Sequence, residues 1–334
     1  MPIRIGINGF GRIGKLVFRL SVEDPEIEIV HVNDKMNLDL IEHLIKYDSL
    51  HGKFDAEVKV ERDQIVVNGK QILITHAAKP GMIPWQRTRV DLVVESSGQF
   101  KTRSQIEEHI RRGVNKVLLS CPSDDKTIDK TVIMGINHHK LLPTDRIISN
   151  SSCTANCVAI LLKVLNESFG LKRAFMNTVH PSTNNQNLQD GYHPDFRRAR
   201  SALNNIIPTT SSAVNSIPDV MPEMKGIFDG FATRVPVSDC SFAELTAQLD
   251  KDVTCDEINN AFKIYSSKEL SKYLEYCEDP IVSSDVNNNY YSAIFDSLST
   301  RVLVKDLIQV IAWYDNESGY SARIIDLIKY IANL

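Results

Sequence analysis

A cysteine between hydroxyl side chains is the first candidate for chemistry. The segment 150–157 reads NSSCTANC and precedes a long apolar run. Ser151 and Ser152 are good N-cap residues, which places Cys153 in the first turn of a helix. Backbone N–H groups and the helix dipole at that position lower a thiol pKa, so Cys153 is the candidate nucleophile. On an ideal helix Cys157 lies too far from Cys153 for a disulfide, and we expect it in the core.

A nucleophilic thiol needs a base, and His180 is the best placed of nine histidines. It follows the apolar strand predicted over Ala174–Val179, 27 residues after the cysteine. Strand ends present side chains to clefts, which favours this histidine as the base. A surface histidine or a hydrogen-bonded core histidine would give the same pattern.

The glycine-rich segment at the start of the chain predicts a dinucleotide site. Gly9, Gly11 and Gly14 form a G-x-G-x-x-G motif between a predicted strand and a predicted helix. Asp34 follows 20 residues later at the end of a second strand, which completes the Rossmann pattern. The helix N-terminus would bind the pyrophosphate, and the Asp34 carboxylate would hold ribose hydroxyls. This favours NAD, although Lys35 leaves NADP open; the alternative is a purely structural glycine turn.

Hydroxyl and guanidinium groups follow His180, and together they form a natural receptor for phosphate oxygens. A solvated polar loop or a subunit contact would look the same. The residues concerned are Ser182, Thr183, Arg197, Arg198, Arg200, Thr209, Thr210, Ser211, Ser212 and Arg234.

The elements that position these residues fall into two groups. The first 150 residues alternate short β-rich runs with amphipathic helices, which predicts a mostly parallel sheet covered by helices. An Asn68-Gly69 pair between apolar runs predicts a hairpin there. A long helix over Thr154–Phe169 and longer alternating strands follow. We therefore expect an α/β Rossmann domain over 1–151 and 317–334, and an α+β catalytic domain with a mainly antiparallel sheet over 152–316.

Composition excludes several classes of protein. The 334 residues are 43% hydrophobic and carry a formal net charge of −4, which argues against a dedicated nucleic-acid partner. We find no apolar run of transmembrane length and no secretory signal at the N-terminus, so we expect no membrane partner and a cytoplasmic location. The six cysteines include no CxxC pair, so no metal site is expected.

Together these motifs resemble the glyceraldehyde-3-phosphate dehydrogenase family from end to end. The matching segments, in order, are INGFGRIG, VND, KYDSLHGKF, VVESSG, ISNSSCTANC, TVH, NIIPTT, RVPV and WYDNESGYSARIIDL. The resemblance implies a cytoplasmic glycolytic oxidoreductase that uses NAD and inorganic phosphate on a triose phosphate. It also implies a homotetramer in which the 184–210 connection reaches a neighbouring subunit's cofactor site.

The resemblance further implies roles for single residues. Cys153 would form a hemithioacetal and then a thioester, with His180 as its base. Arg12 and Ile13 would contact the pyrophosphate, and Ser120 and Asn316 the nicotinamide side. The substrate phosphate would be held by Thr183 and Arg234, and the attacking phosphate by Ser152, Thr154, Ser211 and Ser212, with Arg198 nearby.

Six positions depart from the usual family pattern: Ala78, Ala155, Asn185, Ser211, Ser212 and Ser318. The segment Tyr192–Arg198 also resembles erythrose-4-phosphate dehydrogenase, a close relative, which tends to lose the hydroxyl retained here at Thr183. That enzyme is the alternative function, and phosphate dependence discriminates the two because it releases its thioester mainly to water. A binding role without catalysis is the third reading; the intact Cys153 and His180 argue against it.

Overall fold

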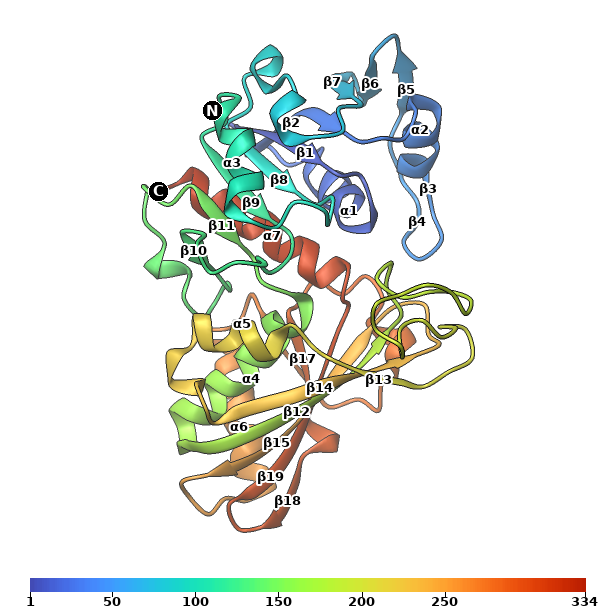
Figure 1. Cartoon of the computed structure of the whole chain (residues 1–334). Coiled ribbons are helices and arrows are strands. Elements are labelled where there is room, and N and C mark those ends of the chain that lie inside the picture. Colours follow the sequence, from blue (N-terminus) through green and yellow to red (C-terminus); the bar gives the residue numbers. More distant parts are fainter. The chain divides into compact units, whose positions relative to one another are not determined.

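The computed structural model describes residues 1–334 and divides into two compact units (Figure 1). The first comprises 1–132, 138–151 and 321–334, and the second 133–137 and 152–320. Compared with the expected boundaries, 133–137 and 317–320 group with the second unit. None of the helices combines the length and the hydropathy that a bilayer span requires.

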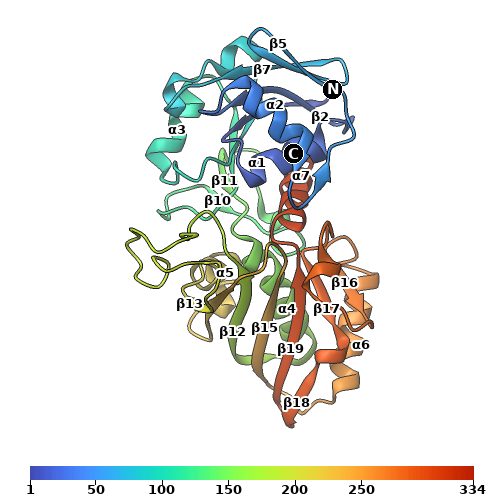
Figure 2. The same ribbon diagram turned by 90° about the vertical axis from the view of Figure 1, so that its right-hand side faces the viewer.

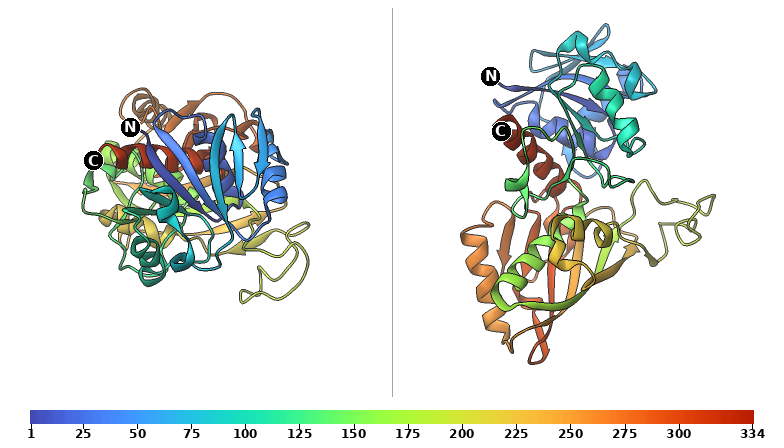
Figure 3. Two further views of the ribbon diagram at one scale, coloured as in Figure 1. Left: turned by 90° about the horizontal axis from the view of Figure 1, so that it is seen from above. Right: turned by 60° about the vertical axis from the view of Figure 1, so that its left-hand side comes forward.

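The first unit contains a nine-stranded sheet whose central strands are parallel, as the alternation of strands and helices predicts. The view from above in Figure 3 shows neighbouring strands side by side. In spatial order the strands are β10 (Lys130–Thr131), β11 (Ile147–Ser149), β9 (Lys116–Leu119), β8 (Leu92–Glu95), β1 (Ile3–Asn8), β2 (Ile27–Asn33), β7 (Lys70–Thr75), β6 (Gln64–Val67) and β5 (Val58–Glu61).

The chain order of these strands creates a switch point between β1 and β8. From β1 the chain proceeds to β2 on one side, whereas β8 pairs with β1 on the other side, and both pairings are parallel. In open α/β sheets ligands bind at the carboxyl ends of strands at such a point. The fold therefore places a binding crevice where the glycine motif begins.

Helices and short antiparallel elements complete the first unit. The predicted hairpin is confirmed: β6 and β7 are antiparallel, and Asn68 and Gly69 have the positive φ that a tight turn requires. Trp85 lies in an apolar core with strand residues such as Val93 and Val117. The helices are α1 (Arg12–Ser21), α2 (Leu38–Lys46) and α3 (Arg103–Arg111), and a small ribbon pairs β3 (Tyr47–Asp48) with β4 (Gly52–Lys53).

The second unit is built on an eight-stranded, mainly antiparallel sheet, visible in Figure 2. Two of its pairings are parallel. β14 runs parallel to β12, because a connection of more than forty residues returns the chain to the same end of the sheet, and β16 runs parallel to β17. The strands are β13 (Ile207–Thr209), β14 (Phe228–Val235), β12 (Leu171–Pro181), β15 (Ser241–Leu249), β19 (Leu307–Tyr314), β17 (Ala293–Asp296) and β16 (Leu274–Cys277), with β18 (Arg301–Val304) paired to β19.

Helix α4 (Cys153–Phe169) forms the core of this unit. It packs against β12, β15, β17 and β19, and eleven of its seventeen residues are buried. Ser152 caps it by accepting a hydrogen bond from Ala155 N, as its residue type predicts. The remaining helices of this unit are α5 (Ala213–Val220) and α6 (Cys255–Ser267), whereas most of α7 (Ser318–Ala332) belongs to the first unit. Residues 182–206 form a long loop that extends from the body of the unit (Figures 2 and 3).

Candidate active site

The nucleophile and its base lie together in the second unit. Cys153 is the first residue of α4, and His180 is the penultimate residue of β12. Cys153 Sγ lies 3.5 Å from His180 Nε2. Two residues 27 positions apart therefore meet because one begins the central helix and the other ends a strand packed against it. This arrangement can transfer a proton from thiol to imidazole.

The ring nitrogen of His180 that faces away from the thiol has two contacts that favour opposite tautomers. His180 Nδ1 lies 2.9 Å from the Pro181 carbonyl and 2.5 Å from Arg234 Nη1. The carbonyl requires a proton on Nδ1, whereas the guanidinium, which only donates, requires a bare Nδ1. Arg234 Nη1 also donates to the Pro181 carbonyl at 2.8 Å. The contacts at Nδ1 are thus compatible with either tautomer, and it is the Nδ1–H tautomer that leaves Nε2 bare towards Cys153, as proton transfer requires.

Burial sets the resting charge of this pair. Burial, and to a smaller extent the positive charge of Arg234, lowers the pKa of His180 to about 3. Burial also raises the pKa of the Cys153 thiol, and Arg234 and the hydrogen bonds of Thr154 only partly oppose this rise. The resting pair is therefore a thiol and a neutral imidazole. The structure thus departs from the expected low thiol pKa, because desolvation outweighs the helix N-terminus.

A buried tyrosine links the two elements that carry the pair. Tyr314 Oη lies 2.8 Å from Thr154 Oγ1, beside the nucleophile, and 2.8 Å from Thr178 Oγ1, two residues before the base. Thr178 donates its own proton to the Phe242 carbonyl, so Tyr314 donates to Thr178 and accepts from Thr154. Sequence reasoning missed Tyr314, because alternation along β19 indicates only that it faces the core.

The phosphate-binding candidates occupy different environments. Thr183 and Asn185 are exposed, whereas Arg198 is held by Thr209 and Thr210. The hydroxyls of Ser152 and Thr154 already serve Ala155 N and Tyr314. A phosphate can therefore be bound only through the hydrogen-bonding positions that these two hydroxyls still have, or through backbone N–H groups.

The start of helix α5 can offer the backbone N–H of Ser212 to an anion, whereas the next N–H, that of Ala213, donates to Ser211 Oγ at 3.4 Å. Its N-cap is Ser212, which makes no side-chain capping bond, and its first turn carries no acidic residue. Ser212 has a φ of −66°, so the family's usual glycine is not needed here for backbone freedom.

The first unit fits a dinucleotide at its switch point. Gly9 has a φ of 92°, and a Cβ there would collide with the Ser97 backbone. A Cβ on Gly14 would collide with the Gly9 carbonyl, whereas Gly11 faces open space. The N-cap of α1 is Gly11, which has no side chain that could cap the helix. The backbone N–H groups at this end can therefore bind phosphate. The local backbone packing therefore requires glycine at positions 9 and 14, and the open space at Gly11 leaves room for a ligand.

Residues beside this loop are held by specific contacts. The Asp34 carboxylate accepts from Phe10 N at 2.6 Å and from Met36 N at 2.9 Å, which fixes it next to the glycine loop. Arg12 forms an ion pair with Asp48. Burial disfavours the Asp48 carboxylate, but its hydrogen bonds to Arg12 and to backbone N–H groups prevail and lower its pKa. Ile13 follows in the first turn of α1.

The nicotinamide candidates are split between the units. Ser120 follows β9 in the first unit, and its N–H donates to the Glu95 carbonyl. Asn316 lies in the second unit, where its side chain accepts from Ser241 Oγ at 2.9 Å. Cys157 is fully buried, as expected of a core residue.

Comparison with known proteins decides the family. A model described as the glyceraldehyde 3-phosphate dehydrogenase NAD binding domain matches residues 3–103, and one described as its C-terminal domain matches 152–316. The chain belongs to the glyceraldehyde-3-phosphate dehydrogenase family. It is 47% identical to the glyceraldehyde-3-phosphate dehydrogenase of Priestia megaterium, with 99% of each chain covered, and 46% identical to that of Geobacillus stearothermophilus, with 100% and 99% covered.

Membership of this family makes the chain an NAD-dependent dehydrogenase with a Rossmann domain. The glyceraldehyde-3-phosphate dehydrogenase 1 of Bacillus subtilis is also 46% identical over 99% of each chain. These relatives are all named glyceraldehyde-3-phosphate dehydrogenase, so the erythrose-4-phosphate dehydrogenase alternative is not favoured.

Proposed function

We propose that the chain catalyses a glycolytic reaction, in which D-glyceraldehyde 3-phosphate, NAD and inorganic phosphate give 1,3-bisphosphoglycerate. The observation that carries the proposal is the 3.5 Å contact between Cys153 Sγ and His180 Nε2, with the Arg234 guanidinium beside the same imidazole. A nucleophile, a base and an anion receptor thus meet in one place. An aldehyde that carries a phosphate matches all three.

The bond changes follow from the chemistry of these side chains. Cys153 Sγ adds to the aldehyde carbon as its proton passes to His180 Nε2. Return of this proton to the former carbonyl oxygen gives a hemithioacetal, and His180 Nε2 accepts the hydroxyl proton when the hemithioacetal is oxidised. Bound NAD supplies the hydride acceptor for the oxidation. The acyl group then remains on Cys153 as a thioester, which retains the free energy that hydrolysis would dissipate. Attack by a phosphate oxygen on the thioester carbon releases the thiolate and forms the acyl phosphate.

Binding roles follow the same reasoning. For NAD we propose Asp34 at the ribose hydroxyls and, at the pyrophosphate, the uncapped start of α1. For the substrate phosphate we propose Arg234 with Thr183. The residues proposed for the cofactor are Gly9, Gly11, Arg12, Ile13, Gly14, Asp34, Ser120 and Asn316, and those for the attacking phosphate are Ser152, Thr154, Ser211 and Ser212, with Arg198 nearby.

We also propose a homotetramer that acts in the cytoplasm. Exposed aromatic rings support the assembly: Phe175 and Phe231 touch on the open face of the second sheet, at 47% and 37% exposure. Tyr192 and Phe196, on the extended loop, are 95% and 89% exposed. Such apolar groups favour burial against another subunit. The six free thiols fit a reducing compartment.

The decisive experiment follows NADH absorbance with purified protein, NAD and glyceraldehyde 3-phosphate, with and without inorganic phosphate. A parallel reaction contains erythrose 4-phosphate. We expect NADH formation with the triose that depends on phosphate. A faster rate with the tetrose that ignores phosphate would reassign the substrate, and no NADH from either sugar would refute the proposal.

A further inference from the structure

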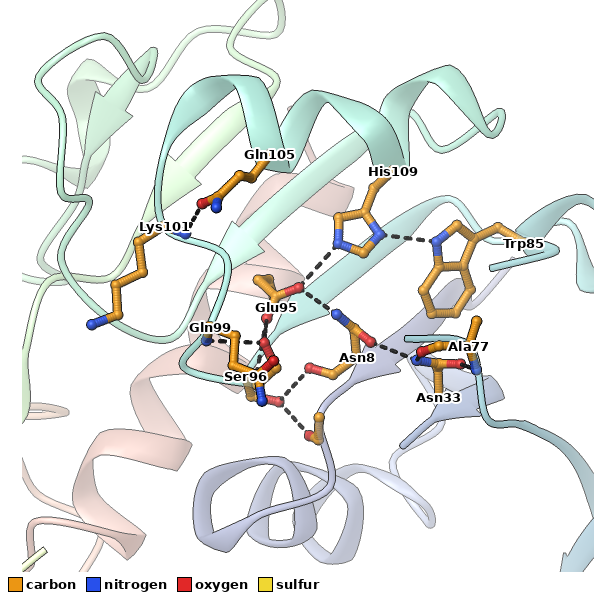
Figure 4. A network of polar contacts seen from close by, with 12 residues as sticks. Asn8, Asn33, Ala77, Trp85, Glu95, Ser96, Gln99, Lys101, Gln105 and His109 are labelled. Carbon is orange, nitrogen blue, oxygen red and sulfur yellow. Dashed lines mark hydrogen bonds and ion pairs between the residues drawn. The ribbon is translucent and has the colours of Figure 1, made fainter. Parts of the chain in front are cut away.

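A continuous chain of side-chain hydrogen bonds runs along the carboxyl edge of the first sheet (Figure 4). It joins the last residues of four adjacent strands: Glu95 of β8, Asn8 of β1, Asn33 of β2 and Thr75 of β7. Asn8 Nδ2 donates to Glu95 Oε2 at 2.6 Å, and Asn33 Nδ2 donates to Asn8 Oδ1 at 2.8 Å. Thr75 Oγ1 donates to Asn33 Oδ1 at 2.8 Å.

The donors in this chain all point towards Glu95. Because Thr75 uses its proton on Asn33, its oxygen accepts from His31 Nε2, 2.9 Å away. On the other side, Trp85 Nε1 lies 3.0 Å from His109 Nδ1. An indole N–H can only donate, so Nδ1 accepts and His109 Nε2 carries the proton that it donates to Glu95 Oε2 at 3.0 Å.

Glu95 is therefore a buried acceptor surrounded by neutral donors. Its side chain is 1% exposed, and its other oxygen accepts from Ser97 N at 2.9 Å and Ser97 Oγ at 2.5 Å. With His109 held neutral by Trp85, no cation among these partners compensates the carboxylate. A buried charge is tolerated only when its hydrogen bonds are complete, so this carboxylate fixes each of its partners firmly.

The fixed residues are those from which the binding loops depart. Gly9 follows Asn8, Asp34 follows Asn33, and Ser96 follows Glu95. The hydroxyl of Ser96 donates to the Gly9 carbonyl at 2.7 Å, and Phe10 N donates to Asp34. A shift of one strand end would thus move the glycine loop and the ribose carboxylate relative to one another.

We propose that Glu95 is a positioning residue for NAD: its carboxylate, oriented by His109 and Trp85, holds the cofactor loops in their binding arrangement. The proposal rests on the cofactor site proposed above. Glu95 contributes no contact to the reacting atoms. Its loss is expected to weaken NAD binding while the chemical steps at Cys153 continue once NAD is bound.

The test is Glu95→Gln, which keeps the shape and replaces one acceptor oxygen by a donor. The amide nitrogen then faces a donor from Asn8, His109 or Ser97. We expect the Kd for NAD, measured by calorimetry on the full chain, to rise at least tenfold. We expect kcat at saturating NAD to stay within about twofold. A Kd within twofold of wild type would overturn the proposal.

A double variant that exchanges the carboxylate and amide groups of residues 95 and 8 tests whether NAD affinity can be restored. In Asn8→Asp with Glu95→Gln, the amide of residue 95 donates to the new carboxylate, whose other oxygen still accepts from Asn33. The His109 N–H still faces the amide nitrogen of residue 95, so the rescue is partial. We expect this double variant to recover at least threefold in Kd over Glu95→Gln alone. Should Glu95→Gln not fold, Thr75→Val removes one outer link and should raise the Kd two- to threefold; an unchanged Kd there would equally refute the proposal.

Two control variants distinguish a positioning role of Glu95 from a general loss of stability and from a failure of the proposed NAD site. Asp145 is a buried carboxylate of the same unit that accepts from Leu142 N just before β11, at the amino end of that strand. Asp145→Asn should leave the Kd for NAD unchanged, and an equal loss of affinity would make the Glu95 effect mere destabilisation. Asp34→Gly tests the cofactor site itself: if it weakens NAD binding and Glu95→Gln does not, only the positioning role fails.

Discussion

Replacing Tyr314 by phenylalanine removes one oxygen from the centre of the catalytic unit. That oxygen makes two hydrogen bonds of 2.8 Å, one from Thr154 and one to Thr178. A buried hydrogen bond contributes about 1 kcal/mol, and a stranded hydroxyl costs 1–3 kcal/mol. Thr178 retains the Phe242 carbonyl, so only Thr154 loses its acceptor. We expect the free energy of unfolding to fall by about 2 kcal/mol.

The same change should loosen the contact between Cys153 and His180, because Thr154 and Thr178 lie on the elements that carry them. We expect kcat to fall about tenfold, which corresponds to 1.4 kcal/mol at the transition state. Urea unfolding measures the first effect and steady-state kinetics the second. Alkylation of Cys153 by iodoacetamide across pH, followed on its peptide by mass spectrometry, reports on the pair directly.

Tyr265→Phe is the matched control, since it removes a tyrosine hydroxyl that donates to Glu167 on the surface. It should change neither kcat nor the alkylation profile. If Tyr314→Phe lowers stability but leaves both the alkylation profile and kcat at wild-type values, Tyr314 is structural only and the reasoning fails.

Three further predictions follow from the same contacts. Cys153→Ser should abolish NADH formation and leave NAD affinity unchanged in calorimetry; surviving turnover would disprove the nucleophile. Asp34→Gly should reduce discrimination between NAD and NADP, and an unchanged ratio of kcat/KM would show that Asp34 does not meet the ribose. Burial lowers the pKa of His31 to about 4, so folding opposes its protonation and stability is lost as pH falls from 6.5 towards 4. His31→Gln should therefore reduce the loss of unfolding free energy between pH 7 and pH 5 by about 2 kcal/mol, whereas an equal loss in both proteins would contradict the shift.

The sequence was sufficient for features with a fixed local pattern. A strand, three glycines, a helix and a later aspartate define the dinucleotide loop, because each glycine answers a backbone requirement within a few residues. The predicted place of Cys153 at a helix start is confirmed for the same reason, since a serine before an apolar run is typical of an N-cap. Asn68-Gly69 likewise specifies its own turn.

Features that depend on long-range packing could not be found in this way. The pKa of Cys153 depends on how completely other elements remove water, and the helix start alone suggests the opposite direction. The role of Tyr314 requires partners 160 and 136 residues away. Glu95 lies in a VVESSG run that is typical of an ordinary strand end, and its donors Asn8 and His109 come from two other segments of the chain. The parallel pairing of β12 and β14 depends on the path of a long connection.

Two of the six departures from the family pattern, Ala155 and Ser212, lie where the backbone N–H makes the relevant contact. Ala155 replaces a common threonine, but its role in the capped turn is its N–H, which donates to Ser152 Oγ at 3.2 Å. Ser212 replaces a common glycine at a φ of −66° that any residue adopts, so its N–H remains available at the start of α5. Neither substitution removes a side chain from the hydrogen-bonded groups around Tyr314 or Glu95. Because both positions keep their backbone donors and both networks keep all their members, we expect the departures to alter phosphate affinity rather than the reaction.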